Sequence, residues 1–230
     1  MALRLYYDLL SQPSRGLFMF LKAANIPFDA KPVALRKGEH LMEEYKDVSR
    51  FQKVPVIEHD GFKLTESVAI MRYLAREFPM ADHWYPRDSR RQARVDEYLE
   101  WQHNNTRFHC AMYFQVKWLQ PILAGEPPKE RRVQSFEKRM VECLDNIENL
   151  WLGKSEFLAG EEISVADILG VCELEQPRMG DYDPREGRPR IKAWMDRVRD
   201  IMNPHYDEAH SVVYSIIERN KTKAPWIAKL

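Results

Sequence analysis

The stretch Ser11-Gln12-Pro13-Ser14-Arg15 follows the first apolar segment of the chain, residues 3–10, and decides how the N-terminal region is read. The apolar segment predicts a strand, and Ser11 to Pro13 interrupt it. Pro13 suits the first turn of a helix, where its missing N–H has no partner to lose. An apolar face then recurs at helical spacing, at Leu17, Phe20, Leu21 and Ala24. A strand, a turn at Ser11 and an amphipathic helix ending near Asn25 are therefore expected.

Further strand and turn patterns follow this helix. They are a second strand over Phe28–Leu35, a short helix around Leu41–Tyr45, a third strand over Lys53–Ile57, a hairpin turn at His59–Gly61, a return strand over Phe62–Leu64, and a helix from Glu66 to about Phe78 with Thr65 as its cap. This order is a strand-helix-strand unit joined to a hairpin and a final helix. It predicts a thioredoxin-like fold with a mixed β-sheet and helices in residues 1–78.

The remainder of the chain has only helical patterns. Residues 79–88 form a linker with two prolines and the buriable Trp84 and Tyr85, and residues 89–230 are expected to form an all-helical domain. Its predicted helices are Arg90–Trp118, Lys129–Leu152, Ser164–Gln176, Pro189–Met202 and His205–Asn220. Ser164-Val-Ala-Asp167 has the form of a capping box, with Ile163 and Ile168 at the staple positions.

Composition narrows the class of protein. The 230 residues suffice for one large domain or two modest ones, and 35 basic residues balance 35 acidic ones. No tract of like charge suggests nucleic acid or an anionic membrane as a partner. No apolar run approaches the ~20 residues of a membrane helix, and the N-terminus is too short for a signal sequence. A cytoplasmic protein is expected.

The three cysteines, Cys110, Cys143 and Cys172, are widely spaced and include no CxxC pair. An odd number at such spacing argues against a disulfide framework, and the histidines show no ligand spacing. Reduced core thiols and no metal site are therefore expected.

Val54-Pro55 precedes the third predicted strand. In this layout the residue before a cis proline exposes its backbone N–H and C=O at a strand edge, and an extended peptide can pair with them as an added strand. The alternative is an ordinary edge-strand proline. In this context the cis form is predicted.

Glu66 and Ser67 lie in the expected first turn of a helix, where unpaired N–H groups attract a carboxylate. Ser67 can add a hydroxyl donor and Glu66 can hold an ammonium, so the pair suits an amino-acid head group. Helix capping alone is the alternative. His40 and Lys53 can donate to a carboxylate at the other end of such a ligand, or can be solvated surface residues.

Ser11 stands between strand and helix, where its hydroxyl can donate to a thiolate. A free thiol titrates near ~8.5, so ionising it at neutral pH takes roughly two pKa units, or about 2.7 kcal/mol. A hydrogen bond to a charged group contributes about 1.5–3 kcal/mol, and a helix N-terminus adds about 0.3–1 kcal/mol. No general base is needed. Ser11 can also be a turn residue or N-cap, and Tyr6, Tyr7 and Ser14 are rival donors.

Gln102–Arg107 is a polar interruption of the first long helical pattern. Asn104 and Arg107 are three residues apart, so they share a face of a regular helix. That face is expected to line a cleft between the two domains, with a solvated stripe as the alternative.

Seven motifs in this order resemble the cytosolic glutathione S-transferases, and most closely the theta class. They are LLSQPSR at Leu9–Arg15, KGEH at Lys37–His40, KVPV at Lys53–Val56, LTESVAI at Leu64–Ile70, WYP at Trp84–Pro86, RVDEYLEWQH at Arg94–His103 and ISVAD at Ile163–Asp167. The resemblance extends from Leu3 to the C-terminal tail. It implies a cytosolic homodimer in which Ser11 stabilises the glutathione thiolate, and it implies no metal.

The resemblance also implies the ligand contacts. The glutathione contacts are Gln12, His40, Lys53, Val54, Pro55, Glu66, Ser67, Asn104 and Arg107. Asn104 stands where several relatives have an acid that reaches glutathione's amine across the dimer, which implies a weaker contact here. The helical domain supplies a mostly apolar pocket for the electrophile, with walls from Phe108, Met112, Trp118 and Trp226, and the tail segment Ala224–Ile227 resembles the cover of that pocket.

The predicted reaction is conjugation of glutathione to small electrophiles, with peroxide reduction by the same thiolate as a second activity. The alternative is a non-catalytic ligand-binding or scaffold protein on the same fold, which would bind hydrophobic dyes and ignore a glutathione resin. An oxidoreductase that uses its own cysteine would need one at the start of the first helix, where this chain has Ser11 and Ser14.

Overall fold

A mixed four-stranded sheet forms the N-terminal part of the protein in the computed structural model, which describes residues 2–222. The strand order is β2-β1-β3-β4, and the strands are β1 (Leu3–Tyr7), β2 (Asp29–Pro32), β3 (Val56–His59) and β4 (Phe62–Leu64). Strand β2 runs parallel to β1, while β3 is antiparallel to both β1 and β4. The prediction of a thioredoxin-like N-terminal fold is confirmed.

The first two strands are shorter than predicted. β1 ends at Tyr7 and β2 at Pro32, because Asp8 draws the following backbone away from the sheet. Its carboxylate accepts the N–H groups of Leu10 and Leu35 at 2.8 and 2.9 Å. The expected hairpin turn is present, and Asp60 and Gly61 both have positive φ angles, 48° and 86°.

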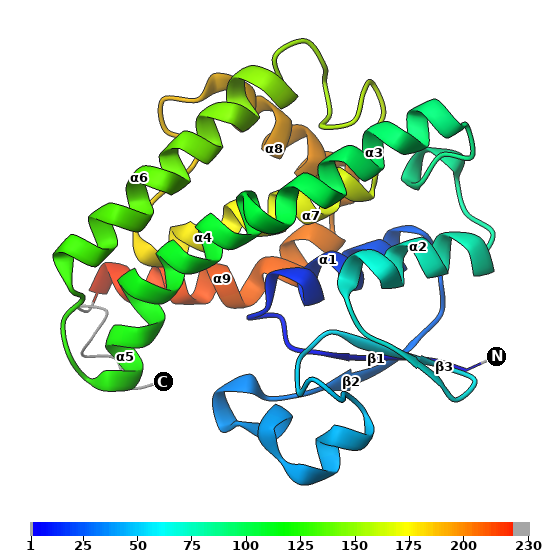
Figure 1. The fold of residues 1–230 in the computed structure, drawn as a ribbon, viewed down its shortest axis with the longest axis horizontal. Helices are drawn as coiled ribbons and strands as arrows, with labels where there is room; N and C mark the ends of the chain where they lie inside the picture. Colours follow the sequence, from blue (N-terminus) through cyan, green and yellow to red (C-terminus); the bar gives the residue numbers. More distant parts are fainter. Residues whose placement is uncertain (1, 223–230) are drawn as a thin grey trace.

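Nine α-helices lie in the described residues, and two of them belong to the sheet region. The bounds are α1 (Gln12–Ala23), α2 (Ser67–Glu77), α3 (Ser89–Trp101), α4 (Thr106–Phe114), α5 (Gln120–Ala124), α6 (Glu130–Asn146), α7 (Val165–Glu175), α8 (Pro189–Met202) and α9 (His205–Thr222). Figure 1 shows α1 and α2 between the sheet and the long helices that follow. The predicted all-helical second part is confirmed, and the predicted linker falls between α2 and α3.

The prediction that Thr65 caps α2 is wrong by one residue. Glu66 occupies the N-cap position with φ 66° and ψ 106°, and its side chain makes no capping hydrogen bond. A glutamate with such a φ is uncommon, and unusual backbone geometry of this kind concentrates at functional sites. The turn before α2 is therefore shaped by Glu66 rather than by a threonine cap.

The single helix predicted over Arg90–Trp118 is also wrong, because Asn105 interrupts it. Asn105 has φ −117° and ψ −101°, and the chain passes through a 3-10 turn at Gln102–Asn104 before α4 begins. The Asn105 side-chain amide donates to the Trp101 carbonyl at 2.7 Å. That bond satisfies a carbonyl oxygen which the broken helix leaves without its backbone donor.

Helix α7 lies at the centre of the molecule. All eleven of its residues are buried, and the predicted capping box at Ser164 and Asp167 is present. Helix α1 packs against α7, and Gly16 makes this close approach possible, since an added Cβ would lie 2.8 Å from a Leu169 methyl group. The core therefore runs without a break from the sheet region into the helices.

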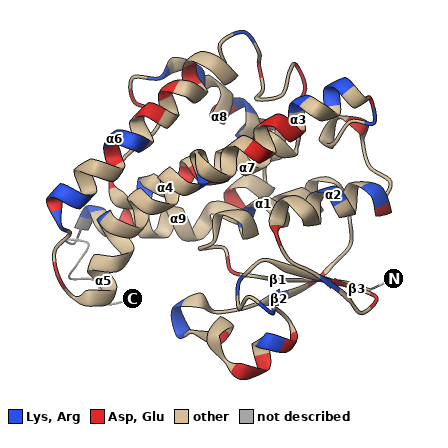
Figure 2. Cartoon of the chain, in the orientation of Figure 1, with Lys and Arg blue, Asp and Glu red and all other residues tan. Residues whose placement is uncertain are grey.

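Charges of both signs alternate over the molecule. Figure 2 shows Lys and Arg interspersed with Asp and Glu along helices such as α3 and α6. Within residues 2–222, no helix combines the length and the apolar composition that crossing a bilayer requires.

Candidate active site

The predicted ligand-binding segments meet at one end of the sheet, and the strand register explains why. Tyr6 pairs with Val56, so the end of β1 lies beside the start of antiparallel β3. Ile57 pairs with Leu64, which brings the end of β4 to the same place. Ser11, the Val54-Pro55 pair and the Glu66-Ser67 turn therefore share one end of the sheet. The end of β2, which leads to His40, also lies there because β2 is parallel to β1.

Ser11 is the N-cap residue of α1, but its side chain does not cap the helix. Its backbone is extended, with φ −83° and ψ 123°, and its hydroxyl makes no capping hydrogen bond. The Ser11 carbonyl accepts the first helical hydrogen bond from Arg15 N at 3.1 Å. Ser11 thus occupies the N-cap position, as the alternative expected, but its hydroxyl has no capping partner within residues 2–222.

The rival donors are less well placed. The Tyr6 hydroxyl donates to Glu58 at 3.0 Å, and Tyr7 stacks on Phe18 with ring centroids 5.4 Å apart. Ser14 is fully buried inside α1. Ser11 is therefore the best candidate among the four.

The Val54-Pro55 peptide bond is cis, as the sequence predicts. Pro55 is buried and Val54 half-buried. His40 lies on a 3-10 turn at Glu39–Leu41, and its Nδ1 atom is buried without a hydrogen-bond partner in the described chain. The exposed Lys53 side chain lies just before Val54. Lys53 can donate to an anionic ligand group, and His40 Nδ1 is a polar atom that residues 2–222 leave unpaired.

Ser67 and Arg107 are brought together across the two parts of the molecule. The Arg107 Nη2 atom donates to the buried Ser67 hydroxyl oxygen at 3.2 Å. Arg107 Nε also donates to Glu173 Oε1 at 3.0 Å. An arginine of α4 thus connects the start of α2 with a carboxylate on α7.

Glu173 is fully buried beneath this contact. Burial raises the pKa of its carboxyl above the ordinary value, while the charge of Arg107, hydrogen bonding from Arg107 and contact with Gln12 oppose the rise. Glu173 Oε1 is therefore bonded to Arg107, while its Oε2 atom has no hydrogen-bond partner within residues 2–222.

The remaining helical candidates are more scattered. Asn104 is exposed, and the break at Asn105 removes the regular spacing by which it was expected to share a face with Arg107.

The predicted pocket residues differ in exposure. Phe108 is 44% exposed and Met112 is half-buried, four residues apart on α4. Trp118 is 2% exposed and belongs to a buried cluster with Leu10, the residue before Ser11. Trp226 and the tail segment around it lie outside the described residues.

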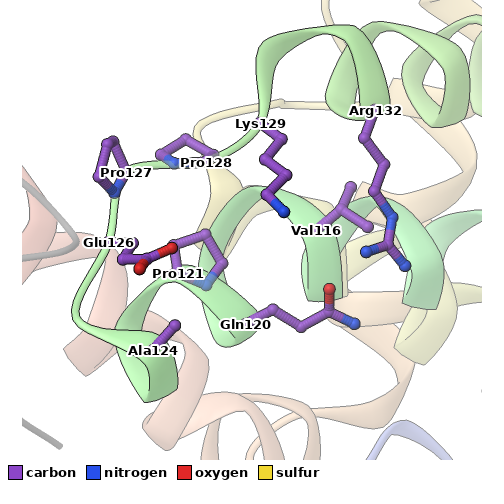
Figure 3. A pocket seen from close by; sticks show the side chains of 9 residues that line it. All are labelled: Val116, Gln120, Pro121, Ala124, Glu126, Pro127, Pro128, Lys129 and Arg132. Atoms are coloured by element: carbon purple, nitrogen blue, oxygen red, sulfur yellow. The ribbon is translucent and has the colours of Figure 1, made fainter.

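An open cavity of about 440 Å³ adjoins the segment before Ser11. Its lining comes from the end of β1, the segment after β2 and helix α9, namely Tyr7, Asp8, Leu9, Pro32, Val33, Ala34, Arg36, Glu39 and Val212. A smaller hollow of about 170 Å³ lies between α5 and the start of α6 (Figure 3). Neither the cavity nor the hollow is lined by a predicted site residue.

The cysteines are unsuited to chemistry of their own. All three are free and buried, and burial raises the pKa of Cys143 and of Cys172 to about 12. The pKa of Cys110 lies well above its ordinary value for the same reason. Across residues 2–222, no group of three or more potential ligand side chains is placed to hold a metal ion.

Sequence reasoning missed four residues that support the site. Asp8, Arg15, Glu173 and Gln176 hold the Ser11 segment or Arg107 in place through hydrogen bonds. Arg15 lies in the opening motif of the sequence, but two of its partners, Cys172 and Gln176, are more than 150 residues away along the chain. A helical pattern cannot indicate such a pairing.

Two family models match the chain. The N-terminal domain of glutathione S-transferases matches residues 2–76, and the C-terminal domain matches residues 109–201. Glutathione S-transferase theta-1 from Bos taurus is 41% identical over 214 residues, which cover 93% of this chain and 89% of that protein.

Solved structures agree with this assignment. Human glutathione-S-transferase T1-1 in its apo form has a TM-score of 0.91 and 38% identity, covering 94% of this chain and 91% of that one. Human glutathione transferase theta-2, in complex with glutathione and an unknown ligand, has a TM-score of 0.91 and 37% identity, covering 97% and 92%. The chain belongs to the glutathione S-transferase family, and within it to the theta class.

Proposed function

We propose that the protein conjugates glutathione to small electrophiles and that the Ser11 hydroxyl stabilises the reacting thiolate. The proposal rests on the position and the hydrogen bonding of Ser11. It stands at the N-terminus of α1, at the sheet end where the ligand-binding segments meet, and its hydroxyl makes no capping bond. The Ser11 hydroxyl can therefore donate a hydrogen bond to a thiolate.

The rest of the tripeptide can be placed on residues of known position. His40 and Lys53 hold its glycyl carboxylate, while the backbone of Val54 pairs with the extended peptide. Glu66 and Ser67 hold the charged γ-glutamyl end at the start of α2, where unpaired N–H groups favour an anion. Gln12 and Arg107 complete the site, since Arg107 already reaches Ser67. The human theta-2 relative was solved in complex with glutathione, which supports glutathione as the ligand.

The chemical step is nucleophilic attack by the glutathione sulfur on the electrophilic atom. A carbon–sulfur bond forms, and the leaving group departs with its electron pair. A hydrogen bond to the thiolate is worth about 1.5–3 kcal/mol, and the N-terminus of α1 adds about 0.3–1 kcal/mol. These terms suffice to keep the thiol ionised near neutral pH without a general base.

The electrophile is proposed to bind beside Phe108 and Met112 on α4. Trp118, which is buried in the cluster that includes Leu10, stays a predicted pocket residue. Peroxide reduction by the same thiolate, with Ser11 in the same role, stays a prediction. The same holds for homodimer formation, which size-exclusion chromatography with light scattering tests, and for Asn104 and Trp226 as site residues.

Replacing Ser11 by alanine tests this proposal. Ser11→Ala is expected to lower kcat/KM for a model electrophile by roughly 10- to 150-fold, the loss of about 1.5–3 kcal/mol of transition-state stabilisation. Ser14→Ala is the matched control, because Ser14 is buried three residues further along the same helix. An S11A enzyme with full activity would remove Ser11 from its proposed role.

A further inference from the structure

The segment from Asp8 to Ser11 is held from two sides. On the sheet side, the Asp8 carboxylate accepts the Leu10 N–H at 2.8 Å, and the Asp8 carbonyl accepts the Ser11 N–H at 3.0 Å. These bonds leave the carbonyl groups of Leu9 and Leu10 without a donor from the strand or the turn. Both of these carbonyls point to the same side chain of α1.

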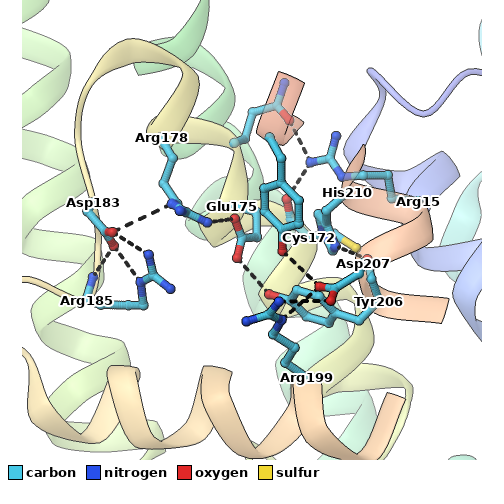
Figure 4. A network of polar contacts seen from close by, with 12 residues as sticks. Arg15, Cys172, Glu175, Arg178, Asp183, Arg185, Arg199, Tyr206, Asp207 and His210 are labelled. Carbon is cyan, nitrogen blue, oxygen red and sulfur yellow. Dashed lines mark hydrogen bonds and ion pairs between the residues drawn. The ribbon is translucent and has the colours of Figure 1, made fainter. Parts of the chain in front are cut away.

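That side chain is Arg15, which lies one helical turn after Ser11 and is fully buried. Its Nη1 atom donates to the Leu9 and Leu10 carbonyls at 2.9 and 3.2 Å. The Nη2 atom reaches α7 and the turn after it, where it donates to the Cys172 carbonyl at 2.8 Å and to Gln176 Oε1 at 2.7 Å. Figure 4 shows Arg15 directed toward Cys172.

Gln176 closes the arrangement. Its Nε2 atom donates to the Leu10 carbonyl at 3.4 Å, so the amide contacts both the guanidinium and the segment that the guanidinium holds. Gln176 is 1% exposed. The two residues before Ser11 are thus fixed to the helical part of the protein, and not only to their own sheet.

A buried guanidinium with neutral partners is an expensive structural element. No carboxylate in residues 2–222 forms a direct ion pair with Arg15, whose charge acts at longer range on buried Glu173, and burying a charge without a direct partner costs several kcal/mol. The planar fork of arginine suits the task, because it can donate in several fixed directions at once. Lysine has one ammonium group and cannot reproduce that geometry.

We propose that Arg15 and Gln176 are positioning residues for the conjugation reaction: they hold the Leu9 and Leu10 carbonyls and thereby aim the Ser11 hydroxyl at the glutathione sulfur. This inference rests on the proposed role of Ser11. A role limited to joining the two parts of the protein would not require both carbonyls immediately before the reactive serine. Two of the four hydrogen bonds that Arg15 makes go to these carbonyls, so its position and that of Ser11 are coupled.

Few groups around Arg15 change charge near neutral pH. Cys172 and Glu173 face it from α7, and His210 faces it from α9. Burial raises the pKa of Cys172 to about 12, and burial together with the charge of Arg15 holds the pKa of His210 well below its ordinary value. Burial raises the pKa of Glu173 from the usual carboxyl range, against the opposing charge of Arg107.

Two variants test the proposal with a readout that a purely structural role would leave unchanged. For Arg15→Lys and Gln176→Met, the pH dependence of kcat/KM and the glutathione dissociation constant are measured side by side. Arg15→Lys is expected to lower kcat/KM at neutral pH by roughly 10- to 100-fold through misplacement of the hydroxyl. Gln176→Met removes one hydrogen bond from the Arg15 guanidinium and a longer one to the Leu10 carbonyl but leaves the other bonds of Arg15, and it is expected to lower kcat/KM by about 2- to 10-fold.

In both variants the pH profile is expected to shift to higher pH, with little change in the dissociation constant of glutathione. Arg188→Lys and Gln92→Met are the matched controls, since Arg188 bonds Asp145 and Tyr182 and Gln92 bonds the Pro86 carbonyl, all away from Ser11. Folding is checked by circular dichroism. Should Arg15→Lys fail to fold, the pH profile of Gln176→Met still tests the proposed positioning role.

A folded Gln176→Met or Arg15→Lys enzyme with the wild-type pH profile and kcat would overturn the positioning role. An equal fall in glutathione affinity and kcat/KM, with no shift of the profile, would also overturn it. Ser11→Ala in the same assay separates the two proposals. If Ser11→Ala leaves the profile unchanged, the proposed function itself fails, whereas a shift in Ser11→Ala alone refutes only the role of Arg15 and Gln176.

Discussion

The sheet end and helix α7 contribute to the same site in opposite ways. The sheet end supplies Ser11, His40, Lys53 and Glu66, which are exposed or half-buried and retain groups that can contact a ligand. Helix α7 supplies buried acidic residues, Asp167, Glu173 and Glu175, each of which accepts at least one hydrogen bond from the protein. One region is arranged for binding, and the other fixes the first region in place.

The physical chemistry explains the division. A ligand-binding group must give up water only when the ligand arrives, so it belongs at the surface of a cleft. A buried polar group has lost its water already and is stable only when its hydrogen bonds are complete. Substitutions on α7 should therefore lower stability first, and substitutions at the sheet end should lower activity first.

Asp167 on α7 offers the largest expected effect on stability. Its buried carboxylate accepts from Leu158 N, Ser164 N, Ser164 Oγ and Trp194 Nε1 at 2.8 to 3.1 Å. Asp167→Ala is expected to lower the free energy of unfolding by about 3–5 kcal/mol, because each buried donor left unpaired costs about 1–3 kcal/mol. Urea denaturation measures this difference.

The control for this prediction is Asp196→Ala. Asp196 pairs with Lys192 at the surface, with side chains 46% and 63% exposed, so its replacement is expected to change stability by less than about 0.5 kcal/mol. Equal losses of stability in the two variants would contradict the claim that the buried polar residues of α7 stabilise the fold more than a surface ion pair does.

Glu173 lies where the sheet end and helix α7 meet. Its replacement should therefore affect both stability and glutathione binding moderately. In Glu173→Gln the acceptor for Arg107 remains but loses its charge. Glutathione binding is expected to weaken by about 1 kcal/mol, roughly 5-fold, as a charged hydrogen bond becomes neutral and Arg107 holds Ser67 less firmly. Calorimetry measures the affinity, and Glu43→Gln at the surface is the control.

The same substitution has a pH-dependent effect on stability. Burial raises the pKa of Glu173, so the folded protein keeps this proton to a higher pH than the unfolded chain does. Between these two values the folded state binds more protons, and the free energy of unfolding falls as pH rises above roughly 4.3. The difference in free energy of unfolding between Glu173→Gln and wild type should therefore shift in favour of the variant as pH rises from about 4. A difference that stays constant as pH rises would contradict the assignment.

Much of the sheet region could be predicted from the sequence, because its signals are local. Pro13 at the start of a helix, the Asp60-Gly61 turn and Val54-Pro55 each constrain the backbone within two or three residues. Strand ends were less accurate, since Asp8 ends both β1 and β2 by bonding the backbone of Leu10 and Leu35. The second of those bonds spans 27 residues and has no local signal.

The support for the site could not be predicted in the same way. Arg15 and Glu173 read as ordinary charged positions in helices, and only the packing of α1 on α7 reveals their partners. The break at Asn105 was missed because asparagine weakens a helix only slightly, and the outcome depends on its bond to the Trp101 carbonyl. Long-range pairing of buried polar groups is the information that a single sequence lacks.

The most direct test of the account is titration of the thiol of bound glutathione, followed by the ultraviolet absorbance of the thiolate in wild type and Ser11→Ala. A free thiol titrates near ~8.5, and the wild-type complex is expected to titrate about 1.5–2 units lower. In Ser11→Ala the value should rise by about 1–2 units, toward that of free glutathione. Identical titration curves for the two proteins would contradict the claim that Ser11 stabilises the thiolate.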